Sequence, residues 1–148
     1  MKKINIKILK LITLFFAIII CLIGCNKEKK FLTGTQWKLI GFVDAVADTM
    51  KIAEPESENC YLISFNKNKK ILGFGGCNTL IGKYDIDYNT NTINIYDIGG
   101  TLIYCPTYDE ELYIESLNKV AFFSIQEEEL RLFYNNRHNY LLFKIQQQ

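Results

Sequence analysis

The chain has 148 residues, of which 49% are hydrophobic, 14% aromatic and 22% charged. This composition is typical of one globular domain, and it excludes disordered and collagen-like chains. A domain of this size buries about two-thirds of its unfolded surface, so it needs neither a metal cluster nor many disulfides to fold. The formal charge is +1, and removing the four lysines that precede residue 25 leaves −3 for the rest. A mildly acidic body argues against binding to nucleic acid.

Residues 11–24 form an almost unbroken apolar run after the amino-terminal lysines, with Thr13 as the only polar side chain. A membrane-spanning helix needs roughly 20 apolar residues, whereas the apolar region of a signal peptide needs about 7 to 15. The 14-residue run therefore predicts a signal peptide over residues 1–24.

The run ends in Leu22-Ile23-Gly24-Cys25, which resembles the lipobox of bacterial lipoproteins. The resemblance implies that Cys25 is acylated and becomes the new amino terminus, and several acyl chains anchor a protein stably. Residues 25–31 would then be a polar tether and 32–148 the domain. The expected location is the cell envelope, facing the periplasm, since the tether lacks the acidic run of surface-export signals. A secreted protein, or an uncleaved anchor with an incidental Cys25, is the alternative.

Apolar and polar patterning predicts strands at residues 35–43, 60–65 and 70–74. The polar stretch 44–59 has no periodicity and contains Pro55, so we expect a long loop there. Residues 66–69 are Asn-Lys-Asn-Lys, and asparagine tolerates the left-handed backbone of tight turns. The second and third strands should therefore form a hairpin.

The second half begins with period-two alternation over residues 82–88 and again around Ile93 and Ile95, which predicts half-buried antiparallel strands. Residues 108–121 change to helical spacing, and residues 107–110 have the form of a capping box. Strands are predicted again at 122–125, 130–134 and 140–145. About eight short strands and one amphipathic helix favour a mainly β fold, either a small antiparallel barrel or a bent sheet with the helix at one end.

Large side chains from all of these segments fall on the faces predicted to point inward. A barrel of about eight strands has an interior just wide enough for such side chains, so we expect a packed core. The predicted interior residues are Trp37, Leu39, Leu62, Tyr84, Ile86, Ile93, Ile95, Leu117, Leu132 and Phe143.

Several short motifs together resemble the META domain family, the HslJ-like bacterial proteins. They follow one another from the Trp37 strand to the predicted helix, over nearly all of residues 32–145. The motifs are Thr35-Gln36-Trp37, Gly75-Gly76-Cys77-Asn78, Gly82-Lys83-Tyr84, Thr101 through Cys105-Pro106, Glu111, and the helix bearing Leu117 and Val120. The resemblance implies a small lipocalin-like antiparallel barrel with a helix. Family members are mostly envelope proteins of unknown molecular activity, loosely linked to stress, virulence and motility.

Cysteine usage leaves three thiols in the domain, because Cys21 leaves with the signal peptide and Cys25 is lipidated. The residues alone allow any pairing among the remaining three, and an oxidising envelope permits a disulfide. The resemblance implies a Cys77–Cys105 bridge, which leaves Cys60 as a buried thiol. These two cysteines do not form a Cys-x-x-Cys motif, so redox catalysis is disfavoured.

Other motifs do not complete a known site. Residues 85–89 resemble the start of a calcium loop, but Thr90 and Tyr96 replace the required glycine and glutamate. The glycines of residues 73–76 lack the dinucleotide-binding pattern. His138 is the only histidine, and no catalytic triad or zinc site accompanies it. We expect neither a cofactor nor a metal.

The sequence therefore predicts a membrane-anchored, non-catalytic module for binding or structure, with no assigned partner. The alternative is a lipocalin-like carrier of a small apolar ligand, and a hydrolase is disfavoured because no nucleophile, base and orienting group occur together. Partner contacts are expected in the acidic loop 44–59 or in a tyrosine-rich segment, since tyrosine suits half-wet surfaces. The tyrosines of that segment are Tyr88, Tyr96, Tyr104, Tyr108 and Tyr113.

Overall fold

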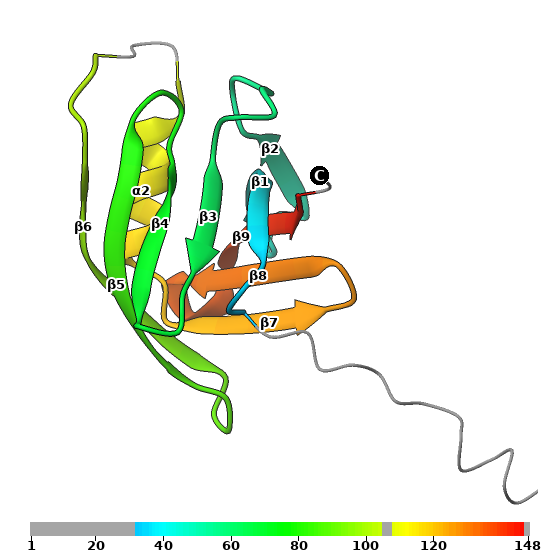
Figure 1. The fold of residues 1–148 in the computed structure, drawn as a ribbon. Coiled ribbons are helices and arrows are strands. Elements are labelled where there is room, and N and C mark those ends of the chain that lie inside the picture. Colours follow the sequence, from blue (N-terminus) through cyan, green and yellow to red (C-terminus); the bar gives the residue numbers. More distant parts are fainter. Residues whose placement is uncertain (1–31, 105–107, 147–148) are drawn as a thin grey trace, which may run out of the picture.

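A computed structural model describes residues 32–104 and 108–146 of the chain. One α-helix, α2 (Glu110–Asn118), and a short 3-10 turn, η1 (Asn135–Arg137), accompany the strands in this part of the chain (Figure 1). The strands are β1 (Gln36–Asp44), β2 (Thr49–Ile52), β3 (Leu62–Phe65), β4 (Lys70–Phe74), β5 (Thr79–Asp87), β6 (Thr92–Gly100), β7 (Phe122–Gln126), β8 (Glu129–Tyr134) and β9 (Asn139–Ile145).

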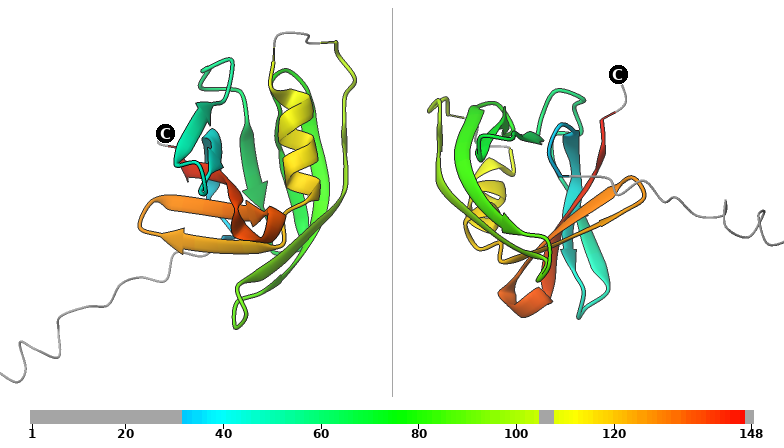
Figure 2. Two further views of the ribbon diagram at one scale, coloured as in Figure 1. Left: turned by 180° about the vertical axis from the view of Figure 1, so that it is seen from behind. Right: turned by 60° about the horizontal axis from the view of Figure 1, so that its bottom comes forward.

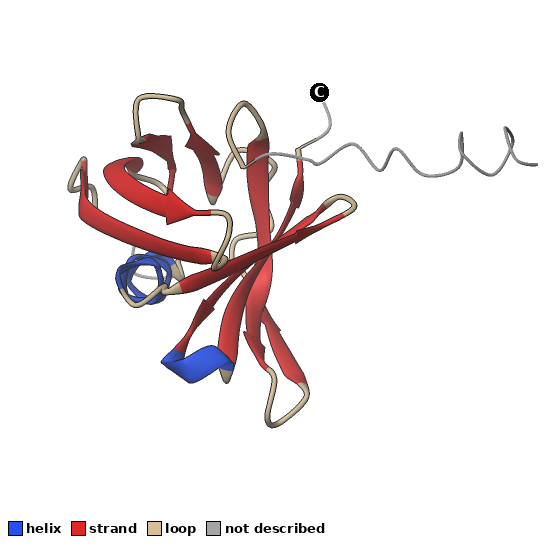
Figure 3. Ribbon diagram, turned by 90° about the horizontal axis from the view of Figure 1, so that it is seen from below, coloured by secondary structure: helices blue, strands red, loops and turns tan. Residues whose placement is uncertain are grey.

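All of these strands belong to one antiparallel sheet that curls round until β9 pairs with β1 (Figure 3). The first residues of β1 pair with β3, and its last residues pair with β2 along the same edge. The pairing between β6 and β7 is the shortest in the sheet, because only Thr92 and Phe122 are in register there. The mainly β, ring-like antiparallel sheet confirms the fold predicted from the patterning.

Helix α2 lies next to β5 and β6, where the pairing between β6 and β7 is short (Figure 2). Tyr113, Ser116 and Leu117 form its buried face. The helix is shorter than the predicted segment 108–121, because the chain turns at Lys119 and enters β7 at Phe122. The helix thus packs against the side of the ring with the least strand pairing.

The interior is filled by side chains from the strands and from α2, and eight of the ten predicted interior residues belong to this core. Ile86 is partly buried and packs against this core. Leu62 is buried as predicted, at 7% exposure, but it does not join this cluster, whereas its neighbour Ile63, in register with Trp37, does. The largest fully buried side chains are Trp37, Tyr61, Tyr84, Tyr113, Phe65 and Phe143.

Strand β2 was missed, because it lies inside the segment predicted to be a long loop. All four of its residues are exposed, so its sequence shows no alternation between buried and exposed positions. It forms by pairing with residues 41–44 of β1, where Gly41 lies so close that an added Cβ would meet the Lys51 carbonyl oxygen at 2.5 Å. The partner strand, rather than the local pattern, determines this element.

The described chain enters the domain at one end of the sheet. Leu32 is fully buried there, Thr33 forms a parallel bridge with Phe65, and the Gly34 amide donates to the Phe65 carbonyl at 3.2 Å. The β3–β4 and β5–β6 turns lie at this end, and the β4–β5 turn and the start of α2 lie at the other (Figure 1). No helix among the described residues has the length and apolarity needed to cross a bilayer.

Candidate functional site

The turn between β4 and β5, residues 75–78, is built from two glycines that permit close approach. A Cβ on Gly75 would lie 2.8 Å from the Glu110 carboxyl group, and one on Gly76 would lie 2.7 Å from the Tyr108 ring. The Gly75 amide closes the turn by donating to the Asn78 carbonyl at 2.7 Å. Glycine is needed here because side chains from the start of α2 occupy the space where a Cβ would be.

Asn78 is 7% exposed, and its side-chain amide uses all four of its hydrogen-bonding capacities. The Oδ1 atom accepts from the Thr101 hydroxyl at 2.8 Å and from the Ile103 amide at 2.7 Å. The Nδ2 atom donates to the Ile103 carbonyl at 3.0 Å and to Glu110 Oε1 at 2.6 Å. One buried side chain thus fixes the segment after β6 to the start of α2.

Glu110 completes this network from the first turn of α2. Its Oε2 accepts from the amides of Cys77 at 2.9 Å and Asn78 at 3.2 Å. The predicted capping box is wrong: the N-cap residue is Asp109, which makes no side-chain bond to the helix, and Glu110 reaches the β4–β5 turn instead. Glu111, part of the motif resemblance, is exposed and is not the residue that contacts this turn. We refer to Asn78, Thr101, Ile103 and Glu110 as the clamp.

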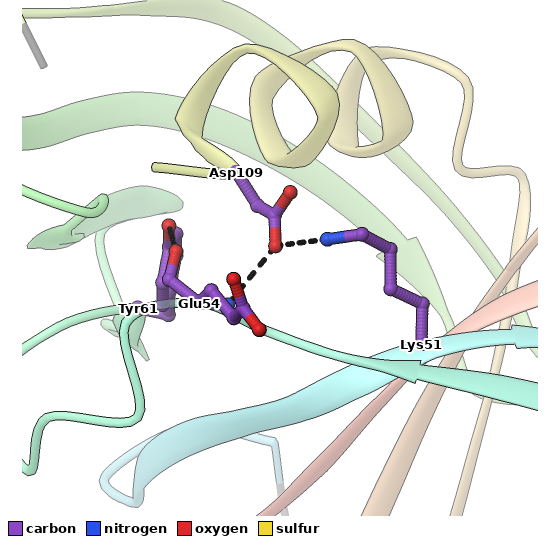
Figure 4. Close-up of polar contacts among 4 residues, drawn as sticks. All are labelled: Lys51, Glu54, Tyr61 and Asp109. Atoms are coloured by element: carbon purple, nitrogen blue, oxygen red, sulfur yellow. Dashed lines mark hydrogen bonds and ion pairs between the residues drawn. The ribbon is translucent and has the colours of Figure 1, made fainter. Parts of the chain in front are cut away.

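A second set of polar contacts joins the β2–β3 connection to the same helix start (Figure 4). The Asp109 carboxylate accepts from the Glu54 amide at 3.0 Å and forms an ion pair with Lys51. The Tyr61 hydroxyl donates to the Glu54 carbonyl. Nearby, Lys38 donates to the carbonyls at Ser57 and Cys60, and burial lowers the pKa of this lysine.

Tyr61 and Tyr113 meet beneath these contacts, with ring centroids 5.5 Å apart in an edge-to-face arrangement. Burial raises the pKa of both phenols above that of an exposed tyrosine. The Tyr113 hydroxyl is buried and has no hydrogen-bond partner among the described residues. Tyr61 adopts a positive φ of 54°, and its amide donates to the Gly75 carbonyl at 2.8 Å.

The clamp holds three consecutive apolar side chains outside the fold. Leu102 is 99% exposed, Ile103 61% and Tyr104 87%. We call these three residues the ridge. Both backbone polar groups of Ile103 are satisfied by Asn78, so the ridge is fixed in place although its side chains contact little of the protein.

The predicted tyrosine-rich patch divides between surface and core. Tyr104 is the most exposed of its five tyrosines, and Tyr88 and Tyr108 are 46% and 37% exposed. The prediction for Tyr113 was wrong, because this residue lies on the buried face of α2 and is fully enclosed. Helical spacing on that face, rather than tyrosine content, determines where Tyr113 points.

The cysteines lie close to the same turn. Cys60 is a free, partly buried thiol, and its Sγ lies 2.8 Å from the Gly76 carbonyl oxygen. Cys77 is not free, and its Sγ lies 3.8 Å from the Ile103 carbonyl oxygen. Cys105, its predicted partner, and Cys25, the predicted lipidation site, lie outside the described residues. The pairing and the acylation therefore stay predictions.

The remaining predicted features are ordinary surface structure. Asp87 accepts from the Asn89 amide at 2.8 Å, as in a turn, and Asp85 pairs with Lys69. Within residues 32–104 and 108–146, no three metal-ligating side chains come together.

The structure gathers Gly76, Cys77, Asn78 and Thr101 at one end of the sheet, whereas Trp37 is a core residue whose indole donates to the Leu32 carbonyl at 3.3 Å. Sequence reasoning missed Glu110 and Ile103. The acidic residues at the start of the predicted helix were a usable signal for Glu110. For Ile103 the sequence offered no signal, because the residue type does not show that its backbone groups bond to a distant side chain.

Comparison with known proteins places this arrangement in a family. A candidate lipoprotein of Tannerella forsythia is 29% identical over 127 residues, which cover 82% of this chain and 84% of that protein. A solved Burkholderia xenovorans protein has the same fold, with a TM-score of 0.65 and 20% identity over 79% of this chain and 85% of that one. A DUF4847 family protein of Bacteroides vulgatus gives a TM-score of 0.60 and 17% identity over 80% and 97%. The family model of the META domain matches residues 30–147, and the chain therefore belongs to the META domain family.

Proposed function

We propose that this chain is a lipid-anchored envelope lipoprotein whose META domain binds a partner protein through the ridge and catalyses no reaction. The observation that carries the proposal is the clamp. Three hydrogen bonds of one buried asparagine hold a segment whose three apolar side chains face solvent, and a fourth joins that asparagine to Glu110 of α2. Exposed, contiguous apolar side chains held on a rigid support are typical of protein interaction sites.

The surroundings of the ridge indicate the chemistry of the partner. Glu54, Glu56 and Glu58 are exposed in the β2–β3 connection, and Glu111 is exposed at the start of α2, at the same end of the molecule. An apolar centre with an acidic margin is complementary to a partner that offers an apolar pocket bordered by lysine or arginine.

Membrane attachment is supported by the lipobox ending at Cys25 and by the related lipoprotein of Tannerella forsythia. We expect Cys25→Ser to release the protein from membranes and to abolish metabolic labelling with a fatty acid. Label that persists on this variant, or that never appears on the wild type, would contradict the lipid anchor.

Site-specific photocrosslinking in cells tests the ridge. A photoreactive amino acid at Leu102 or Tyr104 should give one discrete adduct, whereas the same group at Leu72, which is 52% exposed on β4, should not. Asn78→Ala should weaken the adduct, because the ridge then loses its support. An adduct at position 72 alone, or one that persists undiminished in Asn78→Ala, would contradict the proposal.

The carrier alternative is supported less well. The buried core contains large side chains from most of the strands and from α2, Trp37, Tyr61, Tyr113 and Phe143 among them. Organic-solvent extraction of the purified protein should therefore yield no stoichiometric lipid. An apolar ligand at one per chain that quenches Trp37 fluorescence would instead favour a carrier.

A further inference from the structure

The end of the domain at which the described chain begins carries a cluster of lysines. Three of the five residues 66–70, in the β3–β4 turn and at the start of β4, are lysines, and all three are exposed. Lys83 on β5 is in register with Lys70. We call Lys67, Lys69, Lys70 and Lys83 the lysine rim.

Part of the rim's charge is uncompensated. Lys69 pairs with Asp85 and Lys83 pairs with Asp97, and all four side chains are more than half exposed. Lys67 and Lys70 form no ion pair within the described part of the chain. The rim therefore keeps positive charge that is accessible to a partner.

The other end of the domain has the opposite charge. Glu54, Glu56 and Glu58 lie in the β2–β3 connection, and Asp109, Glu110 and Glu111 lie at the start of α2, with Lys38 and Lys51 as the nearby cations. The view in Figure 1 places these segments at the end of the sheet opposite the β3–β4 turn. Acidic residues thus outnumber lysines at this end, whereas at the other end the four rim lysines outnumber Asp85, Asp87 and Asp97.

The lipid anchor, on which this inference rests, would hold the lysine-bearing end at the membrane. Thr33, the residue after Leu32, bridges to Phe65, which lies two residues before Lys67. Six residues separate Leu32 from Cys25, so the seven steps between the two Cα atoms span at most about 25 Å when fully extended. A domain of this size has a radius of gyration of about 13 Å and a diameter of about 35 Å. The extended tether is therefore shorter than the diameter of the domain. For this reason the end that carries the ridge cannot approach the bilayer as freely as the lysine rim can.

We propose that the lysine rim contacts the anionic phospholipid headgroups of the membrane that holds the anchor, and that this contact orients the domain with the ridge pointing away from the bilayer. Headgroup phosphates attract the lysines, and the same surface repels the acidic end. Tyr88, 46% exposed, directly follows β5 in the β5–β6 turn, and this turn lies at the same end of the sheet as the β3–β4 turn (Figure 1). An amphipathic tyrosine side chain suits the polar headgroup layer.

Lysine acetylation footprinting of the mature lipoprotein in vesicles tests this orientation. One set of vesicles contains about 30% phosphatidylglycerol and the other only phosphatidylcholine. Acetylation of Lys67 and Lys70 should be at least about threefold slower in the anionic vesicles, and about 0.5 M NaCl should remove the difference. Lys144, exposed on β9 and in register with Lys38, serves as the internal control and should react equally in both.

A charge-reversal variant distinguishes contact from general proximity. The Lys67 and Lys70 side chains are exposed, and the turn is held by Asn66, so the double variant Lys67→Glu/Lys70→Glu should fold normally. Acetylation of Lys69 in anionic vesicles should then rise to its rate in phosphatidylcholine vesicles, whereas Lys144→Glu should leave it slow.

The outcomes separate this inference from the proposed function. Flotation of the vesicles in a density gradient measures membrane attachment. If the mature lipoprotein does not float with vesicles of either composition, the proposed lipid anchor is contradicted. If the protein floats but Lys67 and Lys70 are acetylated at the same rate in both kinds of vesicle, the proposed orientation is wrong and the lipid anchor still holds. The same conclusion follows if the acetylation of Lys144 slows as much as that of Lys67 and Lys70.

Discussion

The two ends of the domain are closed by different kinds of hydrogen bond. At the lysine rim, Asn66 Oδ1 accepts from the amides of Asn68 at 3.0 Å and Lys70 at 2.9 Å, so one side chain closes a turn within four residues. At the clamp, Asn78 bonds to Ile103 and Glu110, which lie 25 and 32 residues away. Both ends use an asparagine, but one is a local device and the other joins distant segments.

The comparison teaches how each asparagine contributes to stability. A local turn restricts few residues and is surrounded by water that can replace its bonds. The clamp buries its polar groups, so removing one partner leaves others unsatisfied at a cost of about 1–3 kcal/mol each. We therefore expect equal chemical changes at the two ends to have unequal effects.

The largest effect is expected from removing the predicted bridge beside the clamp. If Cys77 and Cys105 are joined, Cys77→Ala should lower the free energy of unfolding by roughly 3–4 kcal/mol, since the bond closes a ring of about 29 residues. Urea denaturation measures the loss, and reductant should bring the wild type to the variant's stability. Peptide mapping under non-reducing conditions that finds Cys60 in a disulfide would contradict the pairing.

Breaking the clamp itself should come next. Asn78→Ala removes partners from Thr101, Ile103 and Glu110, and we expect a loss of about 2–4 kcal/mol in the free energy of unfolding. Asn94→Ala, at an exposed position of β6, is the matched control and should change stability by less than about 0.5 kcal/mol. Similar losses in the two variants would mean that the clamp contributes no more than a surface residue.

Removing the hydrogen bonds of Asn66 in the β3–β4 turn should lower the free energy of unfolding by less. Asn66→Ala deletes two hydrogen bonds to exposed turn amides, and we expect a loss of about 1 kcal/mol, measured by the same denaturation. A loss as large as that of Asn78→Ala would contradict the expectation that the local bonds of Asn66 stabilise the domain less than the buried bonds of Asn78.

Alkaline pH should weaken the fold through the buried phenols below the clamp. Burial raises the pKa of Tyr61 and Tyr113 in the folded state, whereas an unfolded tyrosine titrates near about 10. The unfolded chain therefore loses these protons first, so the stabilisation is complete below pH of about 10 and is lost as the pH rises further. Tyr113→Phe should make this fall shallower, which denaturation at a series of pH values can measure. An unchanged slope would contradict the role assigned to Tyr113.

The smallest effects are opposite in sign for two rings that touch. Tyr61→Phe removes the bond to the Glu54 carbonyl and should cost about 1 kcal/mol near neutral pH. Tyr113→Phe removes a buried hydroxyl that has no partner among the described residues, so it should leave stability unchanged or raise it by up to about 1 kcal/mol. A clear loss in Tyr113→Phe would indicate a buried water or other partner for that hydroxyl.

The sequence by itself determined the features that depend on neighbouring residues. Alternation over residues 82–88 placed Tyr84 in the core, and helical spacing placed Leu117 there. The Asn66 turn followed from asparagine's short-range bonding, and the motif order from Trp37 to Thr101 indicated the family. These features are local because side-chain direction in strands and helices follows a fixed period.

Only the tertiary structure decided the features that depend on distant segments. Strand β2 has four exposed residues and exists because β1 offers it an edge. Glu110 was predicted to cap its own helix, yet it bonds to Cys77 and Asn78, because the two glycines before them let the turn approach. Ile103 is exposed although its backbone is fully bonded, since Asn78 reaches it from 25 residues away. Buried polar groups must find partners, and the fold determines which segments supply them.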